Sequence, residues 1–348
     1  MKNTFKSDNH INQTHQRLIA INPYIYDKIL YLMSYIPVLD LADYLSGDEA
    51  RRQKFIQGFG KAYSEIGFAA IENHGIPQPV IDKYYGLVEQ FYALPLETKL
   101  SYEKVEYAGQ RGYTSFGREK AKQSEVADLK EFWQVGQYIE DGEVMPADDY
   151  PDNIEVAELP EFNETGKQLY KSFENSGRHL LRAIAEYLGL DVNYFDPRIH
   201  NGNSILRAIH YPPITKEPKS AIRAEAHEDI NLITLLVGAS ASGLQVQDVD
   251  GTWHEAQASP SQIMVNVGDM LQRLCNNKLK STTHRVVNPP REQWHTHRYS
   301  IPFFLHPRSE VRLDCLENCI DAAHPIAYEP ITAGEYLDER LREIGLKK

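Results

Sequence analysis

Residues 225–237, EAHEDINLITLLV, place a histidine and an aspartate two positions apart, just before an apolar run. The run Ile230 to Val237 is typical of a buried strand, and His227 and Asp229 stand at its mouth. Charged groups in such a position carry a large free-energy cost unless a partner compensates them. Because residues two apart on an extended chain point the same way, the imidazole and the carboxylate can converge on one ion.

The composition indicates a folded protein without a nucleic-acid partner. The chain has 348 residues, of which 42% are hydrophobic and 10% aromatic, enough to bury a core. Lys and Arg number 37 against 49 Asp and Glu, a formal charge of −12 that repels phosphate backbones. No run of Lys or Arg suggests a basic groove. Nothing in the sequence indicates the oligomeric state.

A cytoplasmic location is expected, without a membrane partner. The three cysteines, Cys275, Cys315 and Cys319, are too few and too unevenly placed for a disulfide framework or a cysteine-only zinc site. We interpret Cys315 and Cys319 as ordinary small residues of a reducing compartment rather than as a structural or redox pair. Every apolar run is far shorter than the roughly 18 residues of a membrane span. The N-terminus lacks the basic start and apolar stretch of a secretion signal.

Three regions follow one another along the chain. Residues 1–32 are polar and then aromatic without clean periodicity, which indicates a disordered or non-native N-terminal extension, or else a packing arm. Residues 33–200 read as an α/β region packing on the core, with helices expected at 79–94 and 163–190. Residues 201–348 read as a β-rich core followed by a C-terminal helix.

The β-rich core is predicted from six short runs: ILRAIHY, NLITLLV, GLQVQDV, QIMVNVG, THRVV and YSIPFFL. Gly, Pro, Asn and Asp separate them, which favours an antiparallel sandwich or barrel. Helical patterning returns only in EYLDERLREIGL near the end. The predicted fold class is therefore mainly β with flanking helices.

A third candidate metal ligand, His284, lies in the later strand segment STTHRVV. Two histidines and one carboxylate form the facial triad of non-haem Fe(II) oxygenases, which leaves three coordination positions open. A structural zinc site would normally be closed by four ligands. His-x-Asp alone discriminates little, because a hydrogen-bonded histidine at a strand end is common.

Arg298 and Ser300, in HRYSIPFF, form a candidate anion site. On a strand both face the same side and offer a guanidinium fork and a hydroxyl to a carboxylate. The alternative is a surface arginine. The apolar IPFFL that follows favours a specific anionic partner, because a cation beside a buried strand needs compensation.

Together these motifs resemble the 2-oxoglutarate/Fe(II)-dependent oxygenase superfamily, in the branch typified by isopenicillin N synthase and the plant flavonoid and hormone oxygenases. The resemblance runs from about Tyr35 to the C-terminus. IPVLDL, GFAAIENHGIP and GQRGYTSFG resemble the family's N-terminal region. LRAIHYPP, AEAHEDINLITLL, GLQVQDVDGTW, VNVGDMLQRLCNNKLKSTTHRV and RYSIPFFLHP resemble its core, in order.

The resemblance implies a double-stranded β-helix (jelly-roll) core with the metal between its two sheets. The residues matching the family's iron ligands are His227, Asp229 and His284, and those matching its 2-oxoglutarate contacts are Arg298, Ser300 and Tyr211. The implied cofactors are Fe(II), 2-oxoglutarate as cosubstrate, and dioxygen. The implied reaction is hydroxylation of a C–H bond in a small organic substrate, coupled to decarboxylation of 2-oxoglutarate to succinate and CO₂.

Two features leave alternatives open. Many relatives carry Asn where this chain has Ile209, so one polar contact near the cosubstrate is expected to be missing. The branch also contains oxidases that use the same iron triad without 2-oxoglutarate, and in isopenicillin N synthase the Arg-x-Ser pair binds a substrate carboxylate. The alternatives are thus a 2-oxoglutarate-independent non-haem iron oxidase and a non-catalytic jelly-roll binding protein.

Substrate contacts are expected from two segments. Arg207 shares a strand face with Ile209 and Tyr211, and either binds an acidic substrate group or forms a structural salt bridge. Three further candidates lie in a turn expected to cover the site: Arg111, Tyr113 and Phe116. Phe304 faces either the pocket or the core. Four other polar residues are assigned no role, His74 as a turn residue and His295, His297 and Glu228 as solvated ones.

Overall fold

Two β-sheets form the centre of the protein. The computed structural model describes residues 36–120, 126–139, 142–146, 149–238 and 242–347, so the predicted extension at 1–32 lies outside the described residues. The larger sheet has the order β1 (Val38–Asp40), β2 (Phe68–Glu72), β10 (Ile263–Val267), β7 (Ile233–Val237), β12 (Arg298–Leu305), β5 (Ile205–Tyr211), β4 (Glu131–Val135) and β3 (Gly112–Thr114). The smaller sheet has the order β6 (Ala224–His227), β11 (His284–Val286), β8 (Leu244–Gln247) and β9 (Trp253–Glu255).

All strand pairs of both sheets are antiparallel except β1 with β2. The two sheets enclose a cavity, the jelly-roll arrangement expected from the sequence. Strands β1 to β4 come from the N-terminal region and extend the larger sheet at both edges. That region therefore contributes to the sheet itself as well as packing on it.

Eight α-helices and three short 3₁₀ helices surround the sheets in the described residues. The α-helices are α3 (Leu41–Leu45), α4 (Glu49–Glu65), α5 (Gln78–Tyr92), α6 (Leu96–Ser101), α7 (Pro160–Tyr187), α8 (Asp196–Ile199), α9 (Asp269–Leu274) and α10 (Ala333–Glu343). The 3₁₀ helices are η1 (Val105–Tyr107), η2 (Arg291–Gln293) and η3 (Glu317–Cys319). The helices expected at 79–94 and 163–190 correspond to α5 and α7.

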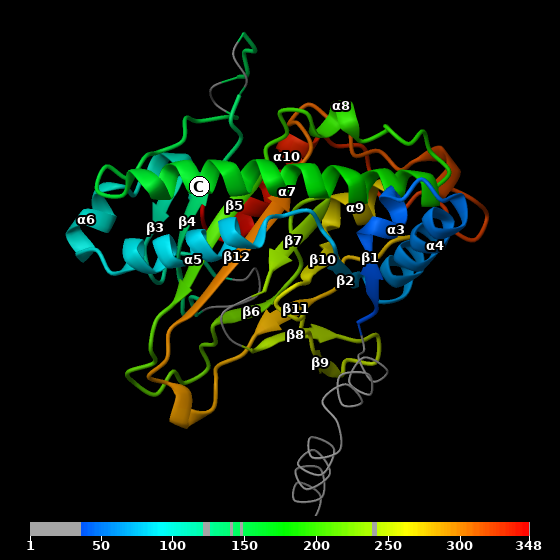
Figure 1. Ribbon diagram of the computed structural model, residues 1–348. Coiled ribbons are helices and arrows are strands. Elements are labelled where there is room, and N and C mark those ends of the chain that lie inside the picture. The colour runs from blue at the N-terminus through cyan, green and yellow to red at the C-terminus, as the bar shows by residue number, and fades with distance from the viewer. Residues whose placement is uncertain (1–35, 121–125, 140–141, 147–148, 239–241, 348) are drawn as a thin grey trace, which may run out of the picture.

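The long helix α7 covers the outer face of the larger sheet, with α5 beside it (Figure 1). Pro160 occupies its first turn, where the missing N–H costs nothing, which explains why it begins before residue 163. Phe173 stacks on Phe303 of β12 with ring centroids 5.3 Å apart. Gly177 lets Leu305 approach closely, because a Cβ there would lie 2.6 Å from the leucine methyl. Each such buried side chain contributes about 1.5–3 kcal/mol.

Strand alternation divides the larger sheet into an apolar outer face and a polar inner face. In β5, Leu206 and Ala208 are buried on the helix side, whereas Arg207, Ile209 and Tyr211 face the cavity. The inner positions of β12 are Arg298, Ser300, Pro302 and Phe304. Because the pleat repeats every two residues, the register of these strands places the polar side chains together.

No described helix has the length and apolar character needed to cross a membrane. The three cysteines all lie within the described residues and are free thiols, with Cys275 and Cys319 buried and Cys315 partly exposed.

Candidate metal centre and active-site cavity

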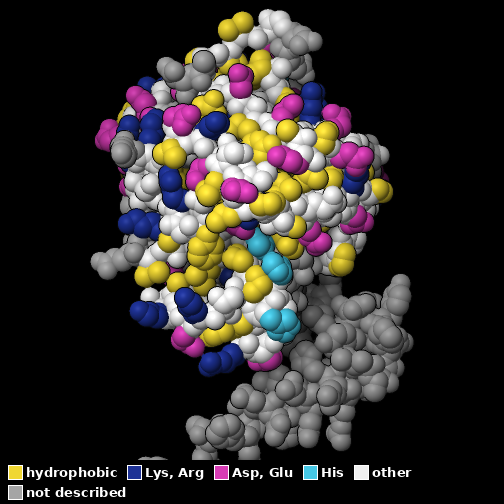
Figure 2. All heavy atoms as spheres, turned by 90° about the vertical axis from the view of Figure 1, so that its left-hand side faces the viewer, with side chains coloured by type: hydrophobic (Ala, Val, Ile, Leu, Met, Phe, Trp, Pro, Cys, Tyr) yellow, Lys and Arg dark blue, Asp and Glu magenta, His cyan; other side chains and the backbone are white. Residues whose placement is uncertain are grey.

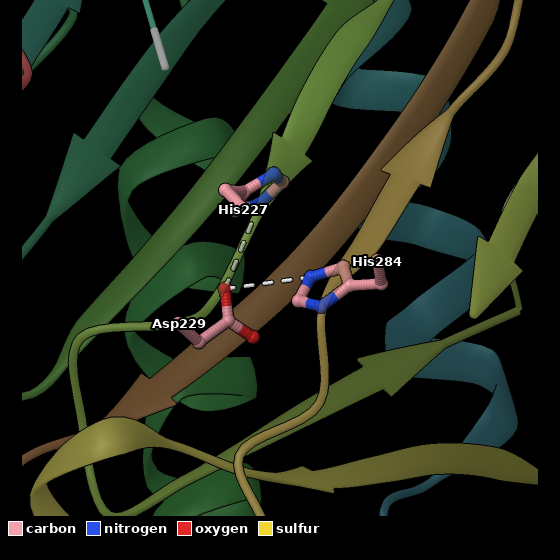
Figure 3. A group of neighbouring side chains, drawn as sticks. All are labelled: His227, Asp229 and His284. Atoms are coloured by element: carbon pink, nitrogen blue, oxygen red, sulfur yellow. Dashed lines mark ion pairs between the residues drawn. The ribbon is translucent and has the colours of Figure 1, made fainter. Parts of the chain in front are cut away.

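Three side chains from two neighbouring strands and a loop meet inside the cavity (Figure 3). His227 ends β6, His284 begins β11, and these two residues pair directly across the smaller sheet. Asp229 follows β6 by two residues and points at both rings. Its Oδ1 lies 3.9 Å from Nε2 of His227 and 3.7 Å from Nε2 of His284. The three ligand atoms lie within 4.8 Å of one another, a spacing that one metal ion can bridge.

Both imidazole rings are held in one orientation by backbone carbonyls. Nδ1 of His227 lies 2.6 Å from the Glu225 carbonyl oxygen, and Nδ1 of His284 lies 3.1 Å from that of Thr282. A carbonyl oxygen only accepts hydrogen bonds, so each Nδ1 donates and each Nε2 keeps a lone pair. Both lone pairs are therefore on the nitrogens that face Asp229.

The two oxygens of the Asp229 carboxylate have different partners. Its Oδ2 accepts hydrogen bonds from Thr234 Oγ1 at 2.6 Å and from Asn266 Nδ2 at 2.8 Å, which leaves Oδ1 for the two histidines. Burial alone would raise its pKa, but the histidines and these two donors outweigh burial, and the pKa is lowered. Burial, together with His284 and Lys130, lowers the pKa of His227 to about 4.

This donor set fits a ferrous ion. The lowered pKa values of His227 and Asp229 favour a neutral imidazole and an ionised carboxylate at neutral pH, which are the states that bind metal. Two nitrogens and one oxygen on one side of an ion match the facial triad and leave three positions open. Within the described residues, this is the one group of three or more His, Cys, Asp or Glu side chains arranged to hold a metal.

A cavity of about 720 Å³ surrounds this centre, and Arg298, Ser300 and Tyr211 line it. Arg298 lies directly opposite Tyr211 in the sheet, with its guanidinium 4.9 Å from the ring centroid, and is 1% exposed. Ser300 lies opposite Ile209, whose apolar side chain also lines the wall. The predicted anion site is therefore assembled on two adjacent strands, with the apolar side chain of Ile209 beside it.

Arg207 also lines the cavity, but its charge is already compensated. Its Nη1 lies 3.1 Å from Glu119 Oε2, and its Nε donates to Gln134 Oε1 at 2.5 Å. The guanidinium lies 4.1 Å from the ring centroid of Phe132 and 5.2 Å from that of Phe304. Of the two roles considered for Arg207, the salt bridge is present. Phe304 lines the cavity.

Glu119 also pairs with Lys130, and sequence reasoning missed this part of the wall. Lys130 Nζ lies 2.6 Å from Glu119 Oε1 and 2.8 Å from Asp128 Oδ2. The available signal was the alternation of Phe132 and Gln134 along β4, continued by Lys130 just before this strand, which was not among the predicted strands.

Acid is expected to weaken the fold through Glu119. Burial alone would raise the pKa of this carboxyl from 4.5, but Arg207 and Lys130 outweigh burial and lower the pKa to about 2. Because the folded-state pKa is depressed, the stabilisation is present above pH 4.5 and is lost as the pH falls toward 2, by about 3 kcal/mol in all. Urea unfolding at about pH 5 and about pH 3.5 checks this. At the higher pH, Glu119→Gln should have a lower free energy of unfolding than the unaltered protein. Its free energy of unfolding should also change less between the two pH values, and an equal change in both proteins contradicts the prediction.

The structure places the three predicted turn residues away from the cavity. Arg111 is 1% exposed and packs so closely on Gly136 that a Cβ there would overlap its guanidinium. Burial lowers the pKa of Arg111 to about 10. Tyr113, on β3, is directed to the helix side and donates to Glu131, which also pairs with Lys99 at 2.9 Å.

Phe116, the third of these residues, is 50% exposed. The expectation that this turn supplies substrate contacts through Arg111, Tyr113 and Phe116 is therefore corrected, because none of the three lines the cavity. Gln110, Glu119 and Lys120 from the same segment do.

The residues assigned no role lie as follows. His74 is buried in a turn, with its Nδ1 accepting a hydrogen bond from the Ile76 N–H at 3.2 Å. His295 and His297 are exposed, and Nδ1 of His297 lies 2.8 Å from Nε2 of His210 on the outer side of the sheet. Glu228 is exposed at the rim of the cavity.

The C-terminal helix α10 forms one wall of the cavity, which the sequence did not indicate. Tyr336, Leu337 and Arg340 line it. The Tyr336 hydroxyl donates to Asp269 Oδ2 at 2.9 Å, and the Asp269 N–H donates to the Asp229 carbonyl oxygen at 2.9 Å. Two hydrogen bonds thus connect α10 to the loop that carries Asp229.

Comparison with known proteins places the chain in a family. A model described as the N-terminal region of non-haem dioxygenases in morphine synthesis matches residues 36–156. The model of the 2OG-Fe(II) oxygenase superfamily matches residues 202–307. A proline hydroxylase, buaE, from Petromyces alliaceus is 34% identical over 326 residues, covering 87% of this chain and 97% of the relative. The chain belongs to the 2-oxoglutarate–Fe(II) oxygenase superfamily.

Solved structures agree with this assignment. A 2OG-Fe(II) oxygenase family protein from Caulobacter crescentus matches with a TM-score of 0.80 and 43% identity, covering 90% of this chain and all of that one. A full-length protein from Neurospora crassa, solved in complex with α-ketoglutarate and thymine, matches with a TM-score of 0.77 and 31% identity, covering 88% of this chain and 96% of that one.

As a member of this superfamily, the protein is an oxidoreductase that oxygenates a small substrate with Fe(II), 2-oxoglutarate and dioxygen. The predicted jelly-roll core and flanking helices are confirmed.

Proposed function

We propose a role for each of six residues around the centre of the cavity. The iron ligands are His227, Asp229 and His284. Arg298 and Ser300 receive the distal carboxylate of 2-oxoglutarate, and Tyr211 assists in binding this cosubstrate. One observation carries the proposal: two imidazole Nε2 atoms and one carboxylate oxygen converge in a cavity that also holds a buried arginine and a serine two residues apart.

The proposed reaction is hydroxylation of a C–H bond in a small organic molecule. When bound, iron and 2-oxoglutarate supply the oxidising chemistry, in which dioxygen is consumed and 2-oxoglutarate is decarboxylated to succinate and CO₂. The chain supplies placement: Thr234 and Asn266 fix the carboxylate of Asp229, and Arg298 fixes the far end of the cosubstrate. Ile209 and Phe304 provide apolar wall that excludes water.

The natural substrate is proposed to be a small molecule and not a nucleic acid. Relatives point the same way, since one is named a proline hydroxylase and another was solved with thymine. On the face shown in Figure 2, basic side chains of the described residues are scattered among acidic and apolar ones rather than gathered into a continuous patch. Free thiols at all three cysteines support the cytoplasmic location that we propose. The predicted boundary between an N-terminal region (33–200) and a core region (201–348) also stays a prediction.

The deciding experiment compares oxygen uptake with and without 2-oxoglutarate. Anaerobic protein with Fe(II) and 2-oxoglutarate should give a weak visible charge-transfer band, and succinate should form when oxygen is admitted. Oxygen uptake that does not depend on 2-oxoglutarate would instead favour an oxidase of the isopenicillin N synthase type. If protein purified without chelator shows no affinity for iron, that result would favour the alternative of a non-catalytic jelly-roll binding protein.

A further inference from the structure

Five polar side chains on one wall of the cavity form a cluster without net charge. We call Glu119, Asp128, Lys130, Gln134 and Arg207 the neutral cluster, and all five line the cavity. Lys130 bridges the two carboxylates at 2.6 and 2.8 Å, and Arg207 pairs with Glu119 at 3.1 Å. The side chains of its four charged members are between 5% and 13% exposed. Two buried cations are therefore balanced by two buried carboxylates.

The neutral cluster retains hydrogen-bond donors but little acceptor capacity. An ammonium has three N–H groups, and the described residues account for two of those on Lys130. Arg207 uses Nε and Nη1, and its Nη2 has no hydrogen-bond partner among the described residues. Both oxygens of Glu119 accept from cations, and Asp128 accepts from Lys130 and from the Glu225 N–H. The cluster can thus donate to a ligand whose charge it cannot neutralise.

The neutral cluster lies beside the proposed iron site. Asp128 Oδ1 accepts a hydrogen bond from the Glu225 N–H at 3.0 Å, and the carbonyl oxygen of Glu225 lies 2.6 Å from His227 Nδ1. Aromatic rings also hold the Arg207 guanidinium, since Phe132 and Phe304 both pack against it. A molecule positioned for oxidation at this site would therefore meet donors that are already fixed in place.

We propose that the substrate presents an uncharged acceptor, such as an amide, lactam or imide carbonyl, to Arg207 and Lys130, and that carboxylates are excluded there. The proposal rests on the proposed function and names its substrate class. A carboxylate there would bring a charge that neither cation of the neutral cluster is left to balance, and Glu119 and Asp128 would repel it. Specificity then comes from rejection of anions as well as from attraction of neutral groups.

The test uses benzamide and benzoate, a matched neutral and anionic pair. Binding to the anaerobic Fe(II)·2-oxoglutarate complex is measured by ligand-observed NMR, with 2-oxoglutarate saturating so that benzoate cannot occupy Arg298. Benzamide is expected to bind at least tenfold more tightly than benzoate. Equal or tighter binding of benzoate, or no binding of benzamide up to its solubility limit, overturns the proposal.

Variants separate charge balance from shape. Glu119→Gln leaves the cluster with one excess positive charge and should raise benzoate affinity at least tenfold. Glu119→Gln combined with Lys130→Gln restores neutrality and should restore the preference for benzamide. Glu217→Gln, an exposed partner of Arg291, is the control for a generic loss of negative charge and should change neither affinity.

Circular dichroism establishes that each variant is folded. If the single variant does not fold, the charge-balanced double variant and the unaltered protein still decide the question. A double variant that prefers benzoate contradicts the electrostatic explanation. Failure of the proposed function would be visible separately as the absence of the charge-transfer band, which does not depend on either probe.

Discussion

Asp229→Ala is expected to abolish both the Fe(II)·2-oxoglutarate charge-transfer band and succinate formation. The substitution removes the one anionic ligand and leaves two buried imidazoles without the carboxylate that they face at 3.7 and 3.9 Å. Loss of an outer partner of a metal ligand typically costs 10–100-fold, so loss of the ligand itself should cost far more. Iron content, the visible band and succinate yield measure the effect, and full turnover by this variant would refute the iron assignment.

Thr234→Val is the graded control for that experiment. It removes the 2.6 Å hydrogen bond to Asp229 Oδ2 but keeps the ligand and nearly the same volume. Iron affinity should fall by about 10–100-fold, between the unaltered protein and Asp229→Ala. An effect as large as that of Asp229→Ala would mean that the site tolerates no disturbance, and the alanine result would then say little about ligation.

Arg298→Gln is expected to weaken 2-oxoglutarate binding by roughly 30- to 1,000-fold. The estimate corresponds to about 2–4 kcal/mol, the cost of removing one partner of a buried, hydrogen-bonded charge pair. The 2-oxoglutarate affinity of Arg298→Lys should lie between those of the unaltered protein and Arg298→Gln, because lysine keeps the charge but loses the planar fork. Titration of the charge-transfer band with 2-oxoglutarate gives the dissociation constant directly.

The chain offers a matched control in Arg223. This second buried arginine is 2% exposed and lies 5.9 Å from the Tyr211 ring centroid, but it does not line the cavity. Arg223→Gln should therefore change 2-oxoglutarate affinity far less than Arg298→Gln. Equal effects would show that total positive charge matters rather than one contact. If Arg298→Gln instead weakened binding of the substrate and left 2-oxoglutarate affinity unchanged, Arg298 would bind a substrate carboxylate.

Short-range patterns predicted the centre of the site. Arg298 and Ser300 are two apart on β12, so the period of the pleat alone orients this pair. His227 and Asp229 are also two apart, but Asp229 lies in the loop after β6, so the pleat orients only His227. The resemblance then joined them to His284. The same alternation on β5 correctly turned Tyr211 toward the cavity.

Long-range pairing explains what the sequence did not reveal. Gln134 lies opposite Arg207 because β4 pairs with β5, and the sequence of a strand does not reveal which other strand it pairs with. The side chains of Arg111 and Tyr113 do not line the cavity, for a related reason. One strand, β3, directs Tyr113 outward toward Glu131, and only its short pairing with β4 defines which way it faces. The position of α10 in the cavity wall is likewise a long-range contact, because the C-terminal part of the chain packs beside strands that come much earlier in the sequence.

The direct pairing of His227 with His284 makes metal affinity a property of strand alignment. A slip of one residue between β6 and β11 would turn one imidazole to the opposite side of the sheet without altering any side chain. By thermodynamic linkage, a ferrous ion that binds only the aligned form must stabilise that alignment in turn. An insertion or deletion that shifts either strand should therefore cost the protein its iron while leaving the eight-stranded sheet folded.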